Sequence, residues 1–140
     1  HSTEGVSWAQ AGRDIPCYGT THADTFYGAI PCARALTPEE INGEYEKETG
    51  KVIIEEFKKR GLDPLDVSGV TVRNHGPFAW GKDEKSAVYN AVVLEEAARM
   101  ARYTESINPE VEEVPQALKD KHYLRKHGKN AYYGQKDDSH

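Results

Sequence analysis

The stretch Val67-Ser68-Gly69-Val70-Thr71-Val72-Arg73-Asn74-His75-Gly76-Pro77 decides the fold class, because it predicts a buried strand that ends in a turn. β-Branched residues fill positions 70–72, as is typical of strands. A helix is predicted to follow, with Asp83 as its N-cap and apolar side chains at helical spacing as far as about Tyr103. A buried strand between helices indicates an α/β domain.

Further helices are predicted on both sides of this stretch. The sequence Trp-Ala-Gln-Ala-Gly at residues 8–12 is typical of the last turns of a helix that Gly12 closes. Thr37-Pro38-Glu39-Glu40 has the N-cap, the first-position proline and the third-position glutamate that begin a helix. This helix is predicted to run to Arg60-Gly61, with a break near Gly43 or Gly50, and a last amphipathic helix to run from about Pro115 to His127.

The remaining strands are short and few. Residues 15–18 and 29–34 suggest edge or irregular strands, because they contain Pro16 and Pro31. Residues 19–28 lie between glycines and are predicted to form a loop. A sheet of these pieces alone would leave an unpaired edge, which complete folds cover. We therefore expect that the N-terminal part of the domain is missing from this sequence, which begins with His1 rather than Met.

The composition predicts a soluble cytoplasmic protein of one domain. Of the 140 residues, 29 % are charged and 37 % hydrophobic, and neither a membrane span nor a signal peptide is evident. A net charge of -5 argues against nucleic-acid binding, and the basic residues in 119–129 are better explained as a solvated helix face. Cys17 and Cys32 form no CxxC pair, so we expect reduced thiols and no cysteine metal site.

Two residues stand out as candidates for chemistry. His75 follows the predicted buried strand, where the scaffold holds a side chain rigidly, although it could equally be a structural histidine in a turn. Asp24 lies in the predicted loop beside Phe26 and Tyr27, and desolvation by these rings would suit a general acid or base. An Asx-turn or a helix cap would explain Asp24 as well. No nucleotide-binding or serine-hydrolase motif is present.

Taken together, five blocks of the sequence resemble the class II aldolase family, and within it the L-ribulose-5-phosphate 4-epimerase subgroup. The resemblance spans residues 1–135 in order and leaves 136–140 as a tail that we expect to be disordered. The blocks are His1-Ser2 with the WAQAG run, GTTHAD with Phe26-Tyr27-Gly28, Asn42 to Gly50, His75 to Gly81, and the C-terminal HYLRKHG and YYGQ.

The resemblance implies a fold and an assembly. Residues 1–135 would be the C-terminal portion of a single class II aldolase-like domain, a three-layer α/β/α fold around a mostly antiparallel sheet. The family assembles as a cyclic homotetramer with its active sites between subunits. The family's first zinc histidine would lie two residues before His1, outside this chain, together with its phosphate-binding loops.

The resemblance also implies an isomerase that interconverts L-ribulose 5-phosphate and D-xylulose 5-phosphate in pentose or ascorbate catabolism. Its cofactor would be Zn²⁺, with His1 and His75 as two of the ligands. Asp24 and Tyr133 would be the catalytic acid/base pair, and His122 would lie near the substrate. Epimerisation would proceed by retro-aldol cleavage between C3 and C4 and re-addition to the other face of the aldehyde.

Two other interpretations remain open from the sequence. A sibling sugar-phosphate aldolase would share the zinc chemistry but release its products. A non-catalytic oligomerisation module, like the adducin head domains, would need none of His75, Asp24 and Tyr133. We expect the 140-residue chain by itself to have doubtful activity, because part of the zinc site would be absent.

Overall fold

The computed structural model describes residues 2–128, and its three strands form one sheet in the order β1-β2-β3. β1 (Cys32–Ala33) pairs in parallel with β2 (Gly69–Val72), and β2 pairs antiparallel with β3 (Gly76–Ala79). Ile15 and Ile30 add an isolated antiparallel bridge. The predicted α/β class is confirmed, and most of these pairings are antiparallel, as expected.

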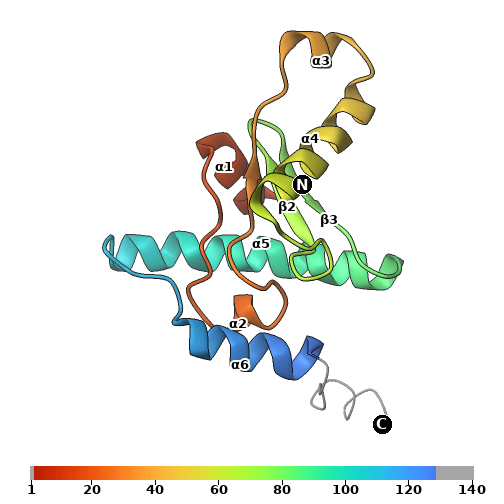
Figure 1. Ribbon diagram of the computed structural model, residues 1–140. Helices are drawn as coiled ribbons and strands as arrows, with labels where there is room; N and C mark the ends of the chain where they lie inside the picture. The colour runs from red at the N-terminus through yellow and green to blue at the C-terminus, as the bar shows by residue number, and fades with distance from the viewer. Residues whose placement is uncertain (1, 129–140) are drawn as a thin grey trace.

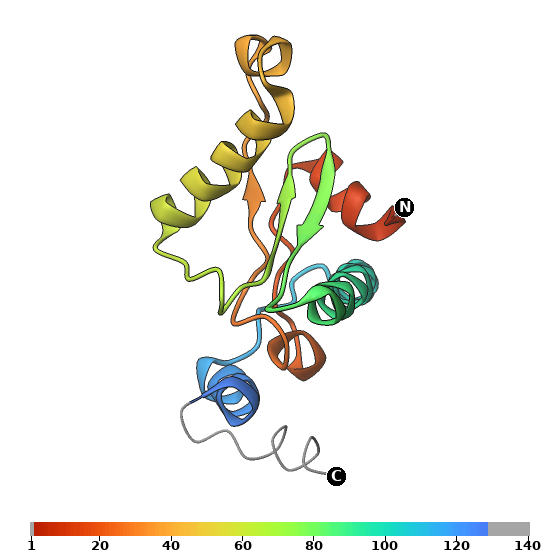
Figure 2. The same cartoon turned by 90° about the vertical axis from the view of Figure 1, so that its right-hand side faces the viewer.

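Six helices surround this sheet within the described residues. Figures 1 and 2 show α4 (Tyr45–Arg60) on one face, and α1 (Thr3–Ala11) with α5 (Glu84–Ile107) on the other, which makes three layers. The short α3 (Pro38–Asn42) extends beyond the sheet with the start of α4, whereas α2 (Thr20–Ala23) and α6 (Gln116–His127) pack together at the opposite end. No helix in this range is long and apolar enough to cross a membrane.

Each face of the sheet has its own hydrophobic core. Against α1 and α5 the core consists of Trp8, Ile15, Phe26, Ile30, Leu94, Ala98 and Ala101. Against α4 it consists of Ala33, Val52, Phe57, Val67, Val70 and Val72. β2 is buried along its whole length because both layers cover it, which explains its run of β-branched residues.

Most predicted helix ends are confirmed by their capping groups. Gly12 closes α1 in the left-handed conformation, Thr37 and Glu40 form a capping box on α3, and the Asp83 side chain accepts from the backbone N–H of Ser86 at the start of α5. The predicted break falls at Gly43, between α3 and α4. Capping side chains satisfy N–H groups that have no partner inside the helix, so they mark helix ends reliably.

Three sequence-based expectations about elements need correction. Residues 19–28 are not wholly a loop, because α2 forms one helical turn there. Gly76–Ala79 is a strand that the sequence analysis did not predict, since Pro77 disfavours one; the proline is tolerated because no described strand pairs with that outer edge of β3. α5 continues four residues beyond Tyr103, to Ile107.

A polar clamp fastens the start of α1 to α5. Ser2 is the N-cap residue of α1, but its side chain does not cap the helix. Instead, the Glu95 carboxylate accepts hydrogen bonds from the Ser2 hydroxyl at 2.6 Å and from the backbone N–H groups of Glu4 and Gly5 at 2.9 Å each. Two helical turns further along α5, the Arg102 guanidinium donates to the Glu4 carboxylate at 2.7 Å. A residue 93 positions away in the sequence therefore supplies the N-terminal cap of α1.

Candidate active site

His75 lies in the turn between β2 and β3, after Asn74, whose backbone is left-handed at φ 69°. The His75 side chain is exposed, and its Nδ1 atom is 3.2 Å from the hydroxyl oxygen of Tyr45, the first residue of α4. The two rings stack with centroids 6.0 Å apart, and Phe78 meets the imidazole edge-to-face at 5.2 Å. Because Nδ1 is engaged in this way, Nε2 is left to bind a ligand, an arrangement that metal-bound histidines use.

A cleft of about 270 Å³ lies beside this imidazole. It is bounded by the segment before α3, the start of α4 and the end of β2, and its lining consists of Ala35, Leu36, Ile41, Tyr45, Val72, Arg73, Asn74 and His75. Arg73 is the cation in this lining. The cleft is therefore a small, partly apolar depression in which His75 can contact a bound molecule.

The fit of the described residues to a zinc ion is partial. Within residues 2–128, no three His, Cys, Asp or Glu side chains lie close enough together to hold a metal ion. His1, the second histidine that the family resemblance links to zinc, lies outside the described residues, as does Tyr133. The described chain thus fits a metal site through one imidazole, His75, and a catalytic zinc needs about three protein ligands.

Asp24 ends α2 as its C-cap residue and directs its carboxylate to α6. Its Oδ1 atom is 3.0 Å from Nδ1 of His122, and its backbone carbonyl oxygen is 2.7 Å from Nε2 of His127. About a quarter of the Asp24 side chain is exposed (24 %), and His122 is exposed to a similar extent (19 %). Two residues proposed for the same site, 98 positions apart in the sequence, are thus in direct contact.

Positive side chains, not aromatic rings, surround the Asp24 carboxylate, which corrects the expectation from the sequence. Nitrogen atoms of Arg125 and Lys126 lie 4.0 Å from its two oxygens. Phe26 is fully buried in the core and does not shield Asp24 from water. The helix-cap alternative holds for the Asp24 backbone, which is the C-cap of α2, whereas the contacts of its carboxylate are with α6.

A stack of three rings holds α6 against the segment that follows Asp24. Tyr27 stacks on Tyr123 with centroids 4.6 Å apart, and Tyr123 stacks on His127 at 4.3 Å. The Tyr27 hydroxyl donates to Asp120, and the Tyr123 hydroxyl donates to Asp66 at 3.2 Å. Burial raises the pKa of Tyr123, which is 2 % exposed, well above its usual range. These contacts fix the position of Asp24 relative to His122.

The two groups of candidate residues lie at opposite ends of the folded molecule. Figures 1 and 2 show the turn between β2 and β3 beside α1 at one end, whereas α2 and α6 lie beyond the other end, across α5. His75 belongs to the first end, and Asp24 and His122 belong to the second. Within one copy these residues do not form a single site.

The structure also identifies site residues that the sequence analysis did not single out. Tyr45 contacts His75 through a hydrogen bond and a ring stack, but nothing in the sequence links two residues 30 positions apart. Arg125 and Lys126 could have been found, because they follow His122 by three and four residues and therefore share its helix face.

Comparison with known proteins places the sequence among metabolic enzymes. Residues 1–102 match the family model described as the class II aldolase and adducin N-terminal domain. Curated proteins from Salmonella paratyphi B, S. paratyphi A and S. typhi are each 58 % identical over 136 residues. Each is named L-ribulose-5-phosphate 4-epimerase UlaF.

The match covers nearly all of this chain but only part of those relatives. It includes 97 % of the 140 residues and 59 % of each relative's length. The chain therefore spans a little more than half the length of the curated proteins that it resembles.

Proposed function

The chain belongs to the class II aldolase and adducin family, and on that premise we propose that it acts in the interconversion of L-ribulose 5-phosphate and D-xylulose 5-phosphate. The identity of 58 % to proteins named as this epimerase supports the choice of reaction over other reactions of the family. The substrate would be a phosphorylated ketopentose and the cofactor Zn²⁺. The cytoplasmic location expected from the sequence belongs to the same proposal.

The observation that carries this proposal is the contact between Asp24 and His122. A carboxylate that is partly exposed, hydrogen-bonded to an imidazole and flanked by Arg125 and Lys126 can exchange a proton with a bound hydroxyl group. A scaffold without catalytic activity would not need this group of ionisable side chains at its surface, which argues against the adducin-like alternative. His122 would hold Asp24 in position and share its proton transfers.

Asp24 would take the proton from the C4 hydroxyl of one epimer as the C3–C4 bond breaks. The bonding electron pair stays with C3, which gives a three-carbon enediolate, and C4 becomes the carbonyl carbon of glycolaldehyde phosphate. After the aldehyde has turned, C3 attacks its other face and a second acid protonates the new C4 oxygen. Tyr133 is our proposal for that second acid. The reverse reaction exchanges the two roles, so no redox cofactor is required.

His75 would be one ligand of the zinc ion, and His1 is proposed as another. A bound zinc ion would supply Lewis acidity that stabilises negative charge on the ketose oxygens. Tyr45 would hold the His75 ring in place through its hydrogen bond at 3.2 Å and leave Nε2 facing the ion. His75 would then orient the ketose end of the substrate, while Asp24 handles protons at C4.

The separation of His75 from Asp24 supports an active site shared between two copies of the chain. The His75 end lies beside the α3–α4 segment, which carries five glutamates and one lysine between residues 39 and 48. The Asp24 end lies beside α6, which carries four Lys and Arg residues and one aspartate. Opposite charges at the two ends favour head-to-tail contact, which generates a ring such as the cyclic tetramer.

An activity assay on the full-length chain tests the proposed reaction. We expect formation of D-xylulose 5-phosphate from L-ribulose 5-phosphate, and a loss of about 10²–10⁴-fold in kcat for Asp24→Asn. Glu96→Gln, on the exposed face of α5 and outside both charged ends, is the matched control and should keep wild-type activity. Steady release of an aldehyde and a ketone would assign the chain to the sibling aldolases, and no turnover of any pentulose phosphate would refute the enzyme proposal.

A mixing experiment tests whether the site is shared. Full-length Asp24→Asn and His75→Asn chains should each be almost inactive, because each damages every site of its own ring. After dissociation and reassembly in equal amounts, about a quarter of the interfaces should combine an intact His75 with an intact Asp24. If mixed rings verified by mass spectrometry recover no activity, both residues serve the same copy's site.

A further inference from the structure

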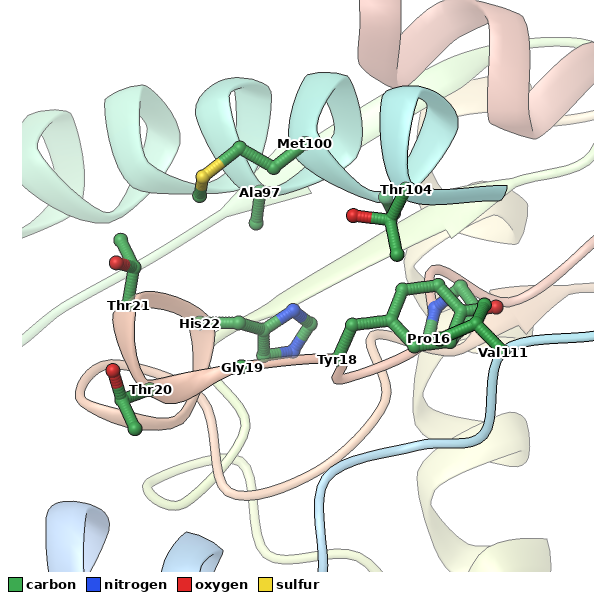
Figure 3. A pocket seen from close by; sticks show the side chains of 11 residues that line it. Pro16, Tyr18, Gly19, Thr20, Thr21, His22, Ala97, Met100, Thr104 and Val111 are labelled. Carbon is green, nitrogen blue, oxygen red and sulfur yellow. The ribbon is translucent and has the colours of Figure 1, made fainter. Parts of the chain in front are cut away.

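A pocket that contains none of the candidate site residues lies between α5 and the segment around α2, next to the Asp24 end (Figure 3). Its volume is about 190 Å³, which exceeds cavities of 150 Å³ known to hold a benzene molecule. One wall is the last part of α5, the opposite wall is the segment 16–22, and Val111 closes one side. Its size suits a ligand of roughly six heavy atoms.

His22 lies at the base of this pocket and is 4 % exposed. Its Nε2 atom is 2.7 Å from the carbonyl oxygen of Gly28. A carbonyl can only accept, so Nε2 carries the proton and Nδ1 has a free lone pair. Burial lowers the pKa of His22 to about 4, so the ring is neutral near pH 7.

The lone pair on Nδ1 has no hydrogen-bond donor among residues 2–128. Figure 3 shows this ring nitrogen facing α5, on the side where Ala97 and Met100 line the pocket. This nitrogen is accessible from the pocket and is not sealed in the core, so a bound group that donates a hydrogen bond can reach it.

The rest of the lining is uncharged. Thr20, Thr21 and Thr104 contribute hydroxyls, which bond to no other residue in the range 2–128. Tyr18 donates its hydroxyl proton to Glu105 at 2.6 Å, and burial together with this carboxylate raises the pKa of Tyr18 to about 12, so it stays neutral. Ala and Met side chains cover the remaining wall. No lining side chain carries a positive charge that would pair with a phosphate or carboxylate.

We propose that this pocket binds a small uncharged hydroxy compound, whose hydroxyl donates to Nδ1 of His22 while its apolar part lies against Ala97 and Met100. This site is distinct from the proposed sugar-phosphate site, because its lining lacks any cation for a phosphate. It uses neither His75 nor the Asp24 carboxylate, so it does not depend on the proposed reaction.

Matched probes test the proposal on the full-length protein at pH 7. Cyclopentanol has six heavy atoms and a hydroxyl donor, whereas cyclopentanone has the same size but no donor. Titrations followed by NMR should give cyclopentanol a millimolar dissociation constant, as six heavy atoms allow, and should shift amide signals of residues 18–22 and 97–104. The ketone should bind at least about fivefold more weakly, the cost of one lost hydrogen bond. Cyclopentanecarboxylate should bind more weakly than the alcohol.

The nitrogen signal of His22 and two variants complete the experiment. Cyclopentanol should move the ¹⁵N resonance of Nδ1, which reports directly on hydrogen bonding. Thr104→Leu narrows the pocket and should weaken binding about tenfold or more, whereas Ser106→Leu, on the same helix but outside the lining, should leave it unchanged. Equal affinity for the ketone or the carboxylate, shifts that map elsewhere, or no binding well above millimolar concentrations would each overturn the proposal.

Discussion

Replacement of Glu95 by glutamine should destabilise the protein by removing the cap that α5 supplies to α1. Oε1 of Glu95 accepts from the Ser2 hydroxyl and from the N–H of Gly5, and Oε2 accepts from the N–H of Glu4. In Glu95→Gln, one oxygen becomes an amide group that can only donate, so at least one donor of α1 faces another donor. The shape of the side chain is kept, so the change isolates hydrogen bonding and charge.

The expected cost follows from these contacts. Loss of one hydrogen bond to a charged acceptor costs about 1.5–3 kcal/mol, and the favourable interaction of a negative charge with the helix N-terminus adds about 0.3–1 kcal/mol. We therefore expect a decrease of about 2–4 kcal/mol in the free energy of unfolding. For a chain of 140 residues, each kcal/mol lowers Tm by about 4 °C, so Tm should fall by about 8–16 °C.

The effect should also depend on pH in a defined direction. Burial alone would raise the pKa of Glu95, but the hydrogen bonds from Ser2, Glu4 and Gly5 outweigh it, and its pKa lies below the ordinary value of 4.5. A lowered folded-state pKa means that the stabilisation is complete above the unfolded pKa and is lost as the pH falls through the folded pKa. The difference in stability between wild type and variant should therefore be largest near pH 7 and shrink below pH 4.5.

Thermal and urea unfolding of the 140-residue chain, followed by circular dichroism, measure this difference. Glu96→Gln is the matched control, because Glu96 is the exposed neighbour on α5 with no hydrogen bond to another described residue. The control should change Tm by no more than about 2 °C. If the two variants lower Tm equally at pH 7, Glu95 does not act as the cap of α1 and the reasoning is refuted.

Further predictions concern the His75 end, the Asp24 end and the buried thiol of Cys17. In the full-length protein, Tyr45→Phe should weaken zinc binding about 10–100-fold through the lost hydrogen bond to His75, and metal analysis of the purified variant checks this. His122→Asn should lower kcat about tenfold or more with little change in KM, because the partner of Asp24 is lost; steady-state kinetics measure both. Burial raises the pKa of Cys17 to about 11, so at pH 8 iodoacetamide should alkylate it at least about tenfold more slowly in the folded chain than in urea, by mass spectrometry. The 140-residue chain alone should bind zinc weakly and show no epimerase turnover above a metal-free control, since its described residues hold no three-ligand group.

Local signals in the sequence predicted most helix ends. The capping box that begins at Thr37 and the cap at Asp83 each involve residues three positions apart, so the sequence contains the whole interaction. α2 was missed because four residues are too few for a helical period to show. β3 was missed because Pro77 is tolerated only at an edge, and the sequence does not show which strand lies there.

The candidate site could be predicted only in part. His75 was singled out from its place after a strand, and the structure puts it in the expected turn. The contact between Asp24 and His122 joins residues 98 positions apart, for which one sequence has no physical signal, so only the family resemblance brought them together. Arg125 and Lys126, which surround the Asp24 carboxylate, are equally distant in the sequence. The sequence analysis therefore considered only the neighbouring aromatic residues. The roles of His1 and Tyr133 stay predictions, because both lie outside the described residues.

The fastening of α1 to α5 has a consequence for the order of events during protein synthesis. The partners of α1 on α5 are Glu95, Ala98 and Arg102, which leave the ribosome about 90 residues after the helix itself. At a synthesis rate of about 5–20 residues per second, these partners emerge about 5–20 s after α1. A helix of nine residues is barely stable alone in water, so it should stay unfolded, with the indole of Trp8 accessible, throughout that interval. A chaperone that binds exposed apolar segments would therefore find its target at α1 and lose it when α5 emerges.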